Sequence, residues 1–265
     1  MINSIIDSHY GCHLNRLNVS CIFYADDILL ISASVSGLQN LLEVCSLASV
    51  QLGLTFNVKK SSCIAFGALA SKVSEPLNLG SEIISWNRYL KYLGANFISG
   101  KKLKPDIDKI KSSFFAACNN ILSNASHCNE ILHLNLQETY VLPILLYACP
   151  ALNFTCAQSD TLSVCWNSVY RRIFGFNRWE SVKLFIAGLG RLDLKHLILW
   201  RKICFLKGIL AAGKSLLVDC LTFMKGNEWS VVLYDDLLVD VSLSKYDLYR
   251  QIVAHFNTVA GFNLA

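Results

Sequence analysis

Residues 21–32 read Cys21-Ile22-Phe23-Tyr24-Ala25-Asp26-Asp27-Ile28-Leu29-Leu30-Ile31-Ser32, with two adjacent carboxylates between two apolar runs. Short apolar runs rich in β-branched and aromatic residues are typical of strands buried on both faces. An ionised carboxylate is costly to bury unless it is paired or bound to a metal. The pattern therefore predicts a tight hairpin that carries Asp26 and Asp27 to the rim of a sheet, where carboxylate oxygens hold a divalent cation such as Mg²⁺.

Further motifs follow this stretch in a fixed order. They are the segment Gly37–Leu42, the lysine-bearing segment Gly53–Ser61, the aromatic segment Tyr89–Gly94, the apolar segment Val141–Tyr147 and the basic segment Arg171–Gly175. Together with Tyr24-Ala25-Asp26-Asp27, this series resembles the reverse transcriptases of non-LTR (LINE-type) retrotransposons, from the central palm motif through the thumb to the region after it. The resemblance covers most of the chain.

The resemblance implies an RNA-directed DNA polymerase, which adds a dNTP to a DNA primer on an RNA template by two-metal chemistry. Asp26 and Asp27 match the hairpin aspartates of that family and are the expected catalytic residues and ligands of Mg²⁺ or Mn²⁺. Tyr24 matches the residue that packs beside the primer end. Lys60 matches the later lysine motif and would act on the leaving pyrophosphate, although a solvated turn lysine explains it equally well.

A third metal ligand of the family, the first palm aspartate, lies well upstream of the hairpin, but only 25 residues precede Asp26. Asp7 is followed by Ser8-His9-Tyr10 rather than by a strand-to-helix pattern. We therefore expect the fingers and half of the palm to be absent, so that a longer chain would have to supply them. Two carboxylates without the third predict a weak Mg²⁺ or Mn²⁺ site and no polymerisation by this chain alone.

The hydrophobic periodicity predicts an α+β fold in three parts. Residues 1–99 form a partial palm, residues 100–180 a helical thumb-like region, and residues 181–265 a further helical region. Inside the first part, a helix over Ser36–Leu52 follows the hairpin, and the Ser36 and Gln39 pair matches a capping box.

Strands are expected on either side of that helix, in a split βαβ arrangement. The segments that follow the helix are strands at Leu54–Val58 and Cys63–Phe66, a loop with a strand in 73–85, and an aromatic-rich hairpin at Arg88–Ile98. Helices are then expected from Asp106 onward, from Asn135 through Tyr147 with Glu138 completing a cap, and at Leu162–Phe174, Leu194–Leu210 and Tyr246–Phe256.

Two groups of side chains suit a nucleic-acid partner. By the resemblance, the second hairpin would grip the primer backbone through Tyr89, Lys91 and Tyr92, although tyrosine is also an ordinary strand residue. The window from Arg88 to Lys111 holds seven Lys or Arg and two Asp, so its net charge of +5 equals that of the whole chain. The lysines after the hairpin that we expect to track phosphates are Lys101, Lys102, Lys104 and Lys109, with a solvated helix face as the alternative.

Composition excludes a disordered chain, because 53% of the 265 residues are hydrophobic and only 16% are charged. Eleven cysteines without a signal-peptide-like start predict a reducing intracellular compartment, the nucleus or the cytoplasm, and not secretion. The spacing of Cys118, His127, Cys128 and His133 departs from that of zinc ligands, so buried, inert cysteines are expected.

Residues 140–157 contain no charge over 18 positions, which is the minimum for a membrane-spanning helix. Pro143 and Pro150 interrupt the stretch, which favours a buried bundle helix and no membrane partner. Three functional interpretations stay open: a reverse-transcriptase fragment, a non-catalytic RNA- or DNA-binding module derived from the thumb, and a functionless element remnant with an exposed apolar face.

Overall fold

The computed structural model describes residues 5, 8, 10–14, 17–68, 70–73, 75–152, 154–213, 216–225, 231–234, 237–240 and 242–261, with the backbone alone at 221–225, 231–234 and 237–240. The chain forms two compact units, which are described separately. Unit 1 comprises 1–104 and 219–224, and unit 2 comprises 105–218 and 225–265. Both combine helices with small antiparallel sheets, which confirms the predicted α+β fold. The three-part division at 99 and 180 stays a prediction.

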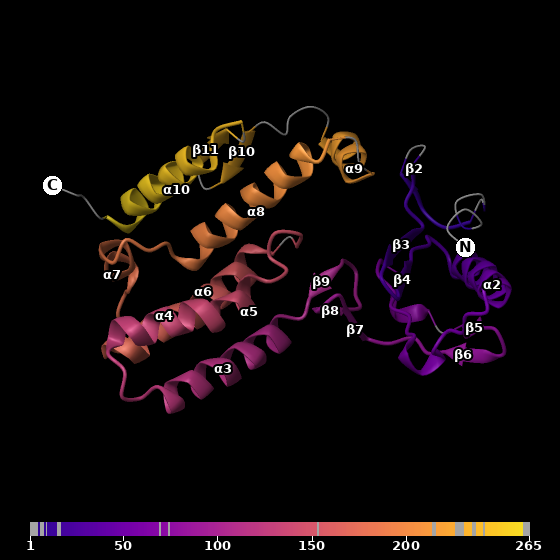
Figure 1. Cartoon of the computed structure of the whole chain (residues 1–265), viewed down its shortest axis with the longest axis horizontal. Helices are drawn as coiled ribbons and strands as arrows, with labels where there is room; N and C mark the ends of the chain where they lie inside the picture. Colours follow the sequence, from indigo (N-terminus) through magenta and orange to yellow (C-terminus); the bar gives the residue numbers. More distant parts are fainter. Residues whose placement is uncertain are drawn as a thin grey trace. The chain divides into compact units, whose positions relative to one another are not determined.

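Unit 1 consists of small hairpins and one long helix, α2 at Val35–Gln51 (Figure 1). Among the residues described in unit 1, four antiparallel hairpins pair successive strands, and a ninth strand is added beside the fourth hairpin. The strands are β1 His13–Leu14, β2 Leu17–Asn18, β3 Cys21–Tyr24, β4 Asp27–Leu30, β5 Leu77–Leu79, β6 Glu82–Ile84, β7 Tyr89–Tyr92, β8 Ala95–Ile98 and β9 Lys104–Pro105. Two short 3-10 helices, η1 Val58–Lys60 and η2 Ala70–Lys72, lie between β4 and β5 in the sequence.

Helix α2 provides the core of unit 1. Its residues Leu41 and Cys45 are buried with Ile5, and Cys21 and Phe23 of β3 pack against this group. The alternate residues of β3, Ile22 and Tyr24, are exposed. The expectation that this strand is buried on both faces is therefore wrong, because a two-stranded ribbon with a single helix beside it is covered on one side only.

The start of α2 differs from the prediction by two residues. Ser34, not Ser36, is the N-cap, and its hydroxyl accepts a hydrogen bond from the Gly37 amide at 3.0 Å. The Gln39 side chain, predicted to complete a capping box, instead bonds both backbone groups of Asn78 in β5, at 2.8 and 3.2 Å. The side-chain amide of Gln39, which the local pattern assigned to the helix cap, is therefore used in a tertiary contact with the β5–β6 hairpin.

The first two strands predicted after α2, Leu54–Val58 and Cys63–Phe66, are wrong, whereas the strand predicted in 73–85 is confirmed by β5 and β6. Residues 54–57 have no regular structure, and Val58–Lys60 is the short helix η1, capped by Asn57. Only isolated parallel bridges, Cys63 to Trp86 and Phe66 to Gly100, occur in the second predicted strand. Within the described residues, β3 and β4 therefore pair only with each other, and the split βαβ sheet is not formed. Apolar runs satisfy strand propensity, but a ladder needs a partner in register.

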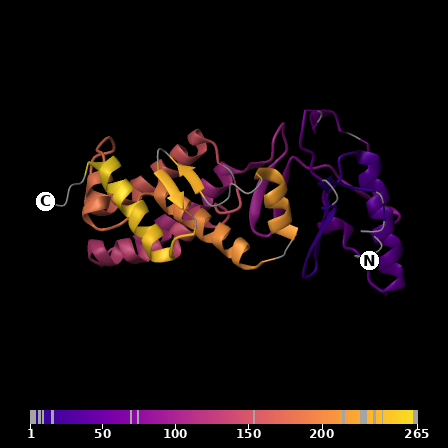
Figure 2. The ribbon, with the colours of Figure 1, turned by 90° about the horizontal axis from the view of Figure 1, so that it is seen from above.

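Unit 2 is a bundle of helices with one peripheral hairpin. Its elements are α3 Ile107–Asn124, α4 Glu130–Tyr140, α5 Leu142–Leu146, α6 Cys156–Phe174, α7 Lys183–Gly188, α8 Leu194–Ala211, β10 Val231–Tyr234, β11 Leu237–Asp240 and α10 Lys245–Ala260. Helix α9, Leu216–Lys225, lies between α8 and β10 in the sequence. Successive contacts join α3, α6, α8 and α10, and Figure 1 shows them as neighbouring layers. The view from above in Figure 2 again places α8 beside α10.

Aromatic side chains form the centre of the unit 2 core. Trp166 and Tyr170 of α6 are fully buried, with ring centroids 5.7 Å apart in an edge-to-face arrangement. Phe114 of α3 meets Trp166 edge to face at 6.5 Å. Large buried rings contribute both apolar area and specific geometry, so this cluster ties α3 to α6.

Helix predictions in unit 2 are largely confirmed. Asp106 caps α3, and α8 and α10 begin and end within a few residues of the expected positions. Helix α6 begins earlier than predicted, at Cys156, where Thr155 and Gln158 form a capping box. The predicted cap at Asn135 is wrong, because Asn129 caps α4 and Asn135 lies inside that helix.

The uncharged stretch 140–157 is not one helix. It contains the end of α4, the short α5, a turn and the start of α6, and its residues Leu145 and Cys149 are buried in the unit 2 core. The interruption by Pro143 and Pro150 was correctly predicted, but the single buried helix was not. Among the helices that the structure describes, none combines the length and apolar character required to cross a bilayer.

Candidate metal and nucleic-acid site

The β3–β4 hairpin carries both predicted metal ligands at its tip. Tyr24 pairs with Asp27, so Ala25 and Asp26 alone form the turn. Ala25 has a positive φ of 49°, as the first central residue of both favoured two-residue hairpin turns does. This turn matches the right-handed twist of the strands, and its two residues leave Asp26 and Asp27 adjacent and exposed. The predicted hairpin is therefore confirmed.

The donor set at this tip suits a weakly held hard cation. Carboxylate oxygens are the ligands that Mg²⁺ and Mn²⁺ prefer, and Mg²⁺ keeps several waters when one or two carboxylates hold it. No cluster of three or more His, Cys, Asp or Glu that could hold a metal occurs in the described ranges. Asp26 and Asp27 thus offer two ligands and leave the remaining positions to water and to phosphate oxygens.

Tyr24 lies beside the two aspartates on the solvent face of β3. Its side chain is 62% exposed, while the neighbouring Phe23 points into the α2 cluster. The aromatic ring is therefore available to a ligand at the tip. This position agrees with the predicted location beside a primer end, which itself stays a prediction.

The β7–β8 hairpin is also confirmed, and it divides the three predicted primer contacts between two faces. Tyr89 and Lys91 are exposed, and the guanidinium of Arg88 lies 5.7 Å from the centroid of the Tyr89 ring. Tyr92, at the turn, is half-buried, and its hydroxyl is shielded from solvent without a hydrogen-bond partner in the described part of the chain. Only Tyr89 and Lys91 are placed to meet an external ligand together.

Burial, and then the negative charge of Asp27, raise the pKa of the Tyr92 phenol. The β3–β4 and β7–β8 hairpins of unit 1 thus interact electrostatically.

Lys60 lies at the end of η1, where the Asn57 side chain accepts a hydrogen bond from its backbone N–H at 3.2 Å. The lysine side chain is exposed. No ion pair of the described residues joins it to Asp26 or Asp27. The structure therefore places Lys60 as a solvated turn residue, and its action on a pyrophosphate stays a prediction.

The predicted lysine cluster is divided between the two units. Lys101, Lys102 and Lys104 are exposed at the end of unit 1, with Lys104 in β9. Lys109 is exposed on the first turn of α3, in unit 2. In the same turn, Lys111 forms an ion pair with Asp108 at 3.4 Å. Unit 1 by itself therefore presents three of the four predicted phosphate contacts.

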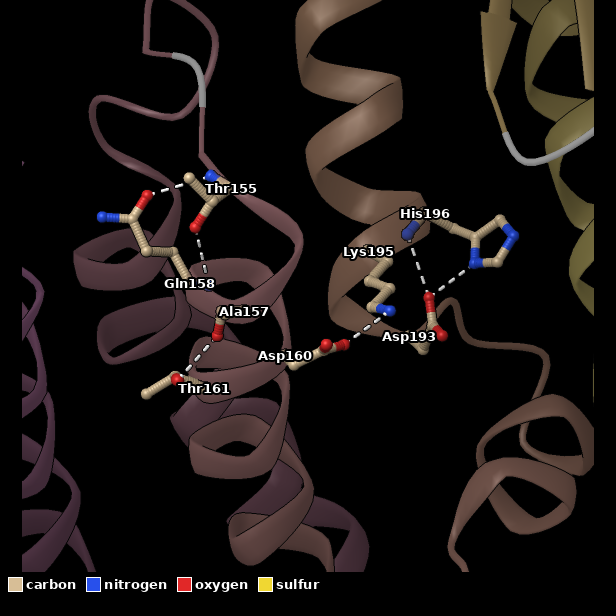
Figure 3. A network of polar contacts seen from close by, with 8 residues as sticks. All are labelled: Thr155, Ala157, Gln158, Asp160, Thr161, Asp193, Lys195 and His196. Carbon is tan, nitrogen blue, oxygen red and sulfur yellow. Dashed lines mark hydrogen bonds and ion pairs between the residues drawn. The ribbon is translucent and has the colours of Figure 1, made fainter. Parts of the chain in front are cut away.

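A partly buried chain of polar residues in unit 2, with His196 buried at its centre, was not anticipated. Asp193 caps α8, and its Oδ1 accepts from the His196 amide at 2.9 Å and lies 2.6 Å from His196 Nδ1 (Figure 3). On the other side, His196 Nε2 lies 3.0 Å from Nδ1 of His255 in α10. Spacing could have revealed the cap, because Asp followed three residues later by a polar residue is typical of helix starts. No sequence pattern indicates the contact with His255, which lies 59 residues further along the chain.

A loop between α6 and α7 presents a second feature that the sequence interpretation missed. Trp179 is 86% exposed, and the guanidinium of Arg178 lies 5.0 Å from the centroid of its ring. An Arg-Trp pair in a polar stretch after a helix-ending glycine, Gly175, was the available clue.

Comparisons with known proteins give one distant relative. Over 174 residues the chain is 27% identical to an uncharacterized transposon-derived protein of Caenorhabditis elegans, which covers 61% of this chain. The chain spans 59% of the length of that relative. No protein-family model matches the chain, and no solved structure matches it. The likeness points to an origin in a transposable element.

Proposed function

We propose that the chain derives from the reverse transcriptase of a non-LTR retrotransposon, binds nucleic acid, and holds Mg²⁺ or Mn²⁺ weakly at Asp26 and Asp27. The observation that carries the proposal is the placement of both carboxylates, adjacent and exposed, at the tip of a two-residue hairpin. Support comes from the ordered motifs around that hairpin, from the Tyr92 hairpin beside it, and from the transposon-derived relative.

The roles follow from the geometry of the tip. Asp26 and Asp27 would hold the cation, and Tyr24 would offer a ring face next to it. A divalent cation bound there supplies positive charge to phosphate oxygens. Exposed Lys91, Lys101, Lys102 and Lys104 of unit 1 add further positive charge for a phosphate backbone.

Primer extension needs more than this tip provides. Two-metal nucleotidyl transfer places two ions about 4 Å apart and needs several carboxylate oxygens between them. The described residues supply two carboxylates at the hairpin and no third acidic, His or Cys ligand. We therefore propose that this chain by itself binds RNA–DNA hybrids without extending a primer, unless a further chain contributes a ligand.

Cation binding tests the assignment of the aspartates directly. Titration with Mn²⁺, followed by electron paramagnetic resonance of the free ion, should show one site with a dissociation constant on the order of 10⁻⁴ to 10⁻³ M. Asp26→Asn and Asp27→Asn should each abolish this binding. Asp108→Asn is the matched control, because Asp108 is exposed and paired only with a surface lysine. Equal Mn²⁺ binding by all four proteins would contradict the assignment.

Function is tested with an RNA template annealed to a DNA primer. We expect salt-dependent binding of this hybrid and no incorporation of dNTP with Mg²⁺ or Mn²⁺. Incorporation that disappears in Asp26→Ala would show that the chain is an active polymerase. Absence of hybrid binding would favour the remnant interpretation over both nucleic-acid functions.

A further inference from the structure

The loop from Gly175 to Val182 is built to hold one large aromatic side chain in solvent. Asn177 donates its backbone N–H and its side-chain N–H to the two carboxylate oxygens of Glu180, at 2.6 and 3.0 Å. In return, the Glu180 N–H donates to the Asn177 carbonyl at 3.1 Å. Trp179 and Arg178 lie between these two closures, so their backbone is fixed although both side chains are exposed.

Two further contacts attach the loop to the bundle. The Arg171 Nε–H of α6 donates to the Glu180 carbonyl at 2.9 Å. Phe176 packs edge to face on Phe185 of α7, with ring centroids 5.0 Å apart, and Phe185 meets Phe174 of α6 at 4.6 Å. The loop is therefore ordered on both sides of Trp179, and the exposure of the indole does not result from an unsupported segment.

Single exposed hydrophobic residues are common and need no function. Trp179 differs because the Arg178 guanidinium lies 5.0 Å from the centroid of its ring, in a segment, 171–183, whose sequence contains four Lys or Arg and one carboxylate. That carboxylate, Glu180, already accepts two hydrogen bonds from Asn177, and those bonds hold its pKa below its usual value. An exposed aromatic ring with a guanidinium beside it, in a segment of net positive charge, is complementary to a polyanion with π-faces, which describes single-stranded nucleic acid.

We propose that Trp179 is a stacking platform for an unpaired base of single-stranded nucleic acid, with Arg178 beside it as a phosphate contact. A protein partner is disfavoured because a cation, Arg178, lies against the ring, and Trp179 is the one exposed large hydrophobic side chain among residues 175–182. A duplex is disfavoured because its bases are already stacked on one another. The proposal rests on the nucleic-acid function proposed above and adds a specific site in unit 2, whereas the aspartate hairpin belongs to unit 1.

The test measures binding of the full chain to short fluorescein-labelled single strands, oligouridylate and oligothymidylate, by fluorescence anisotropy. Trp179→Ala should weaken binding about tenfold, the effect of losing one base–aromatic stack, and Trp179→Phe should restore most of it. Arg178→Gln should reduce the slope of log affinity against log salt by about 0.7. Comparing oligouridylate with oligothymidylate shows whether the unpaired base comes from RNA or from DNA.

Tyr140→Ala is the control, because Tyr140 is 66% exposed on α4 and lies in the stretch 112–170, which has no Lys or Arg. It should bind like the unmodified chain. Unchanged binding by Trp179→Ala, or equal weakening by Tyr140→Ala, would overturn the stacking site and leave the general function intact. Failure of the unmodified chain to bind both single strands and RNA–DNA hybrids would overturn the general function as well.

Discussion

The Asp27 carboxylate and the Tyr92 phenol belong to different hairpins, yet the charge of the first raises the pKa of the second, after burial as the larger cause. The Tyr92 hydroxyl is also shielded from solvent and lacks a hydrogen-bond partner among the described residues. When a shielded hydroxyl next to a carboxylate ionises, no hydrogen bond or positive charge from the described part of the chain stabilises the phenolate that forms. The β3–β4 and β7–β8 hairpins thus influence each other although they do not pair in one sheet.

Asp27→Asn should lower the pKa of Tyr92 toward the ordinary tyrosine value, because it removes the neighbouring negative charge and leaves the burial unchanged. Nuclear magnetic resonance titration of a chain carrying ¹³C-labelled tyrosine would measure this pKa, with Tyr92→Phe identifying the resonance. Asp26→Asn is the control and should leave the Tyr92 titration where it is. An equal decrease in both variants would mean that the net charge of the chain, and not Asp27, sets the value.

Ala25→Gly should stabilise the β3–β4 hairpin. Ala25 has φ 49°, a left-handed conformation that costs an L-residue with a Cβ about 1–2 kcal/mol. Glycine adopts this conformation freely, but it has more conformational entropy to lose on folding, which costs about 0.5–1 kcal/mol. The net gain in the free energy of unfolding is therefore about 0.5–1 kcal/mol. Urea denaturation measures the difference. Ala95→Gly, at an extended position in β8, should have the opposite sign.

Acid should weaken the contact between α8 and α10 through Asp193. Burial by itself would raise the pKa of this carboxyl, but the hydrogen bonds and charge of His196, with Lys183, lower it below the usual value. A depressed folded-state pKa means that ionised Asp193 stabilises the fold at pH values above its unfolded pKa, about 3.9. This stabilisation is lost as the pH falls through the folded-state value.

Asp193→Asn keeps a good N-cap but removes the charge opposite His196, so it should cost about 1–3 kcal/mol near neutral pH. The cost should begin to decrease as the pH falls below about 4, the unfolded-state pKa, and should vanish once the pH is below the lower folded-state pKa. Urea unfolding at a series of pH values measures both. Asp160→Asn is the control, because Asp160 forms an exposed ion pair with Lys195 at 2.7 Å (Figure 3) and such pairs contribute at most about 1 kcal/mol. A pH-independent cost would contradict the assignment to ionised Asp193.

Thiol labelling should separate buried from exposed cysteines. Burial raises the pKa of Cys45 and Cys63 to about 11 and that of Cys149 to about 12, so their reactive thiolate is scarce near neutral pH. Cys156, at the start of α6, is exposed. Iodoacetamide should modify Cys156 first, as peptide mass spectrometry would show, and Cys156→Ser should remove that rapid phase. Early modification of Cys149 in the folded chain would contradict the buried core.

Local sequence determined the elements whose stabilising contacts lie within a few residues. A two-residue turn between apolar runs was enough for the Asp26 and Asp27 hairpin, and the Asp106 cap with an apolar stripe was enough for α3. The predictions failed where a distant partner decided the outcome. Asn135 carries a capping pattern, but its side chain accepts from Arg191 at 2.6 Å, and Arg191 also bonds Glu138 at 2.6 Å.

The sequence by itself determined the α+β class, most helices and the β3–β4 and β7–β8 hairpins, because propensity, caps and turns act through neighbouring residues. Only the tertiary structure decided that residues 54–57 form no strand, that Gln39 bonds to Asn78, and that His196 meets His255. These outcomes depend on which segments come together in space. Pairing in register and burial of polar groups are satisfied by partners far along the chain, which no local pattern specifies.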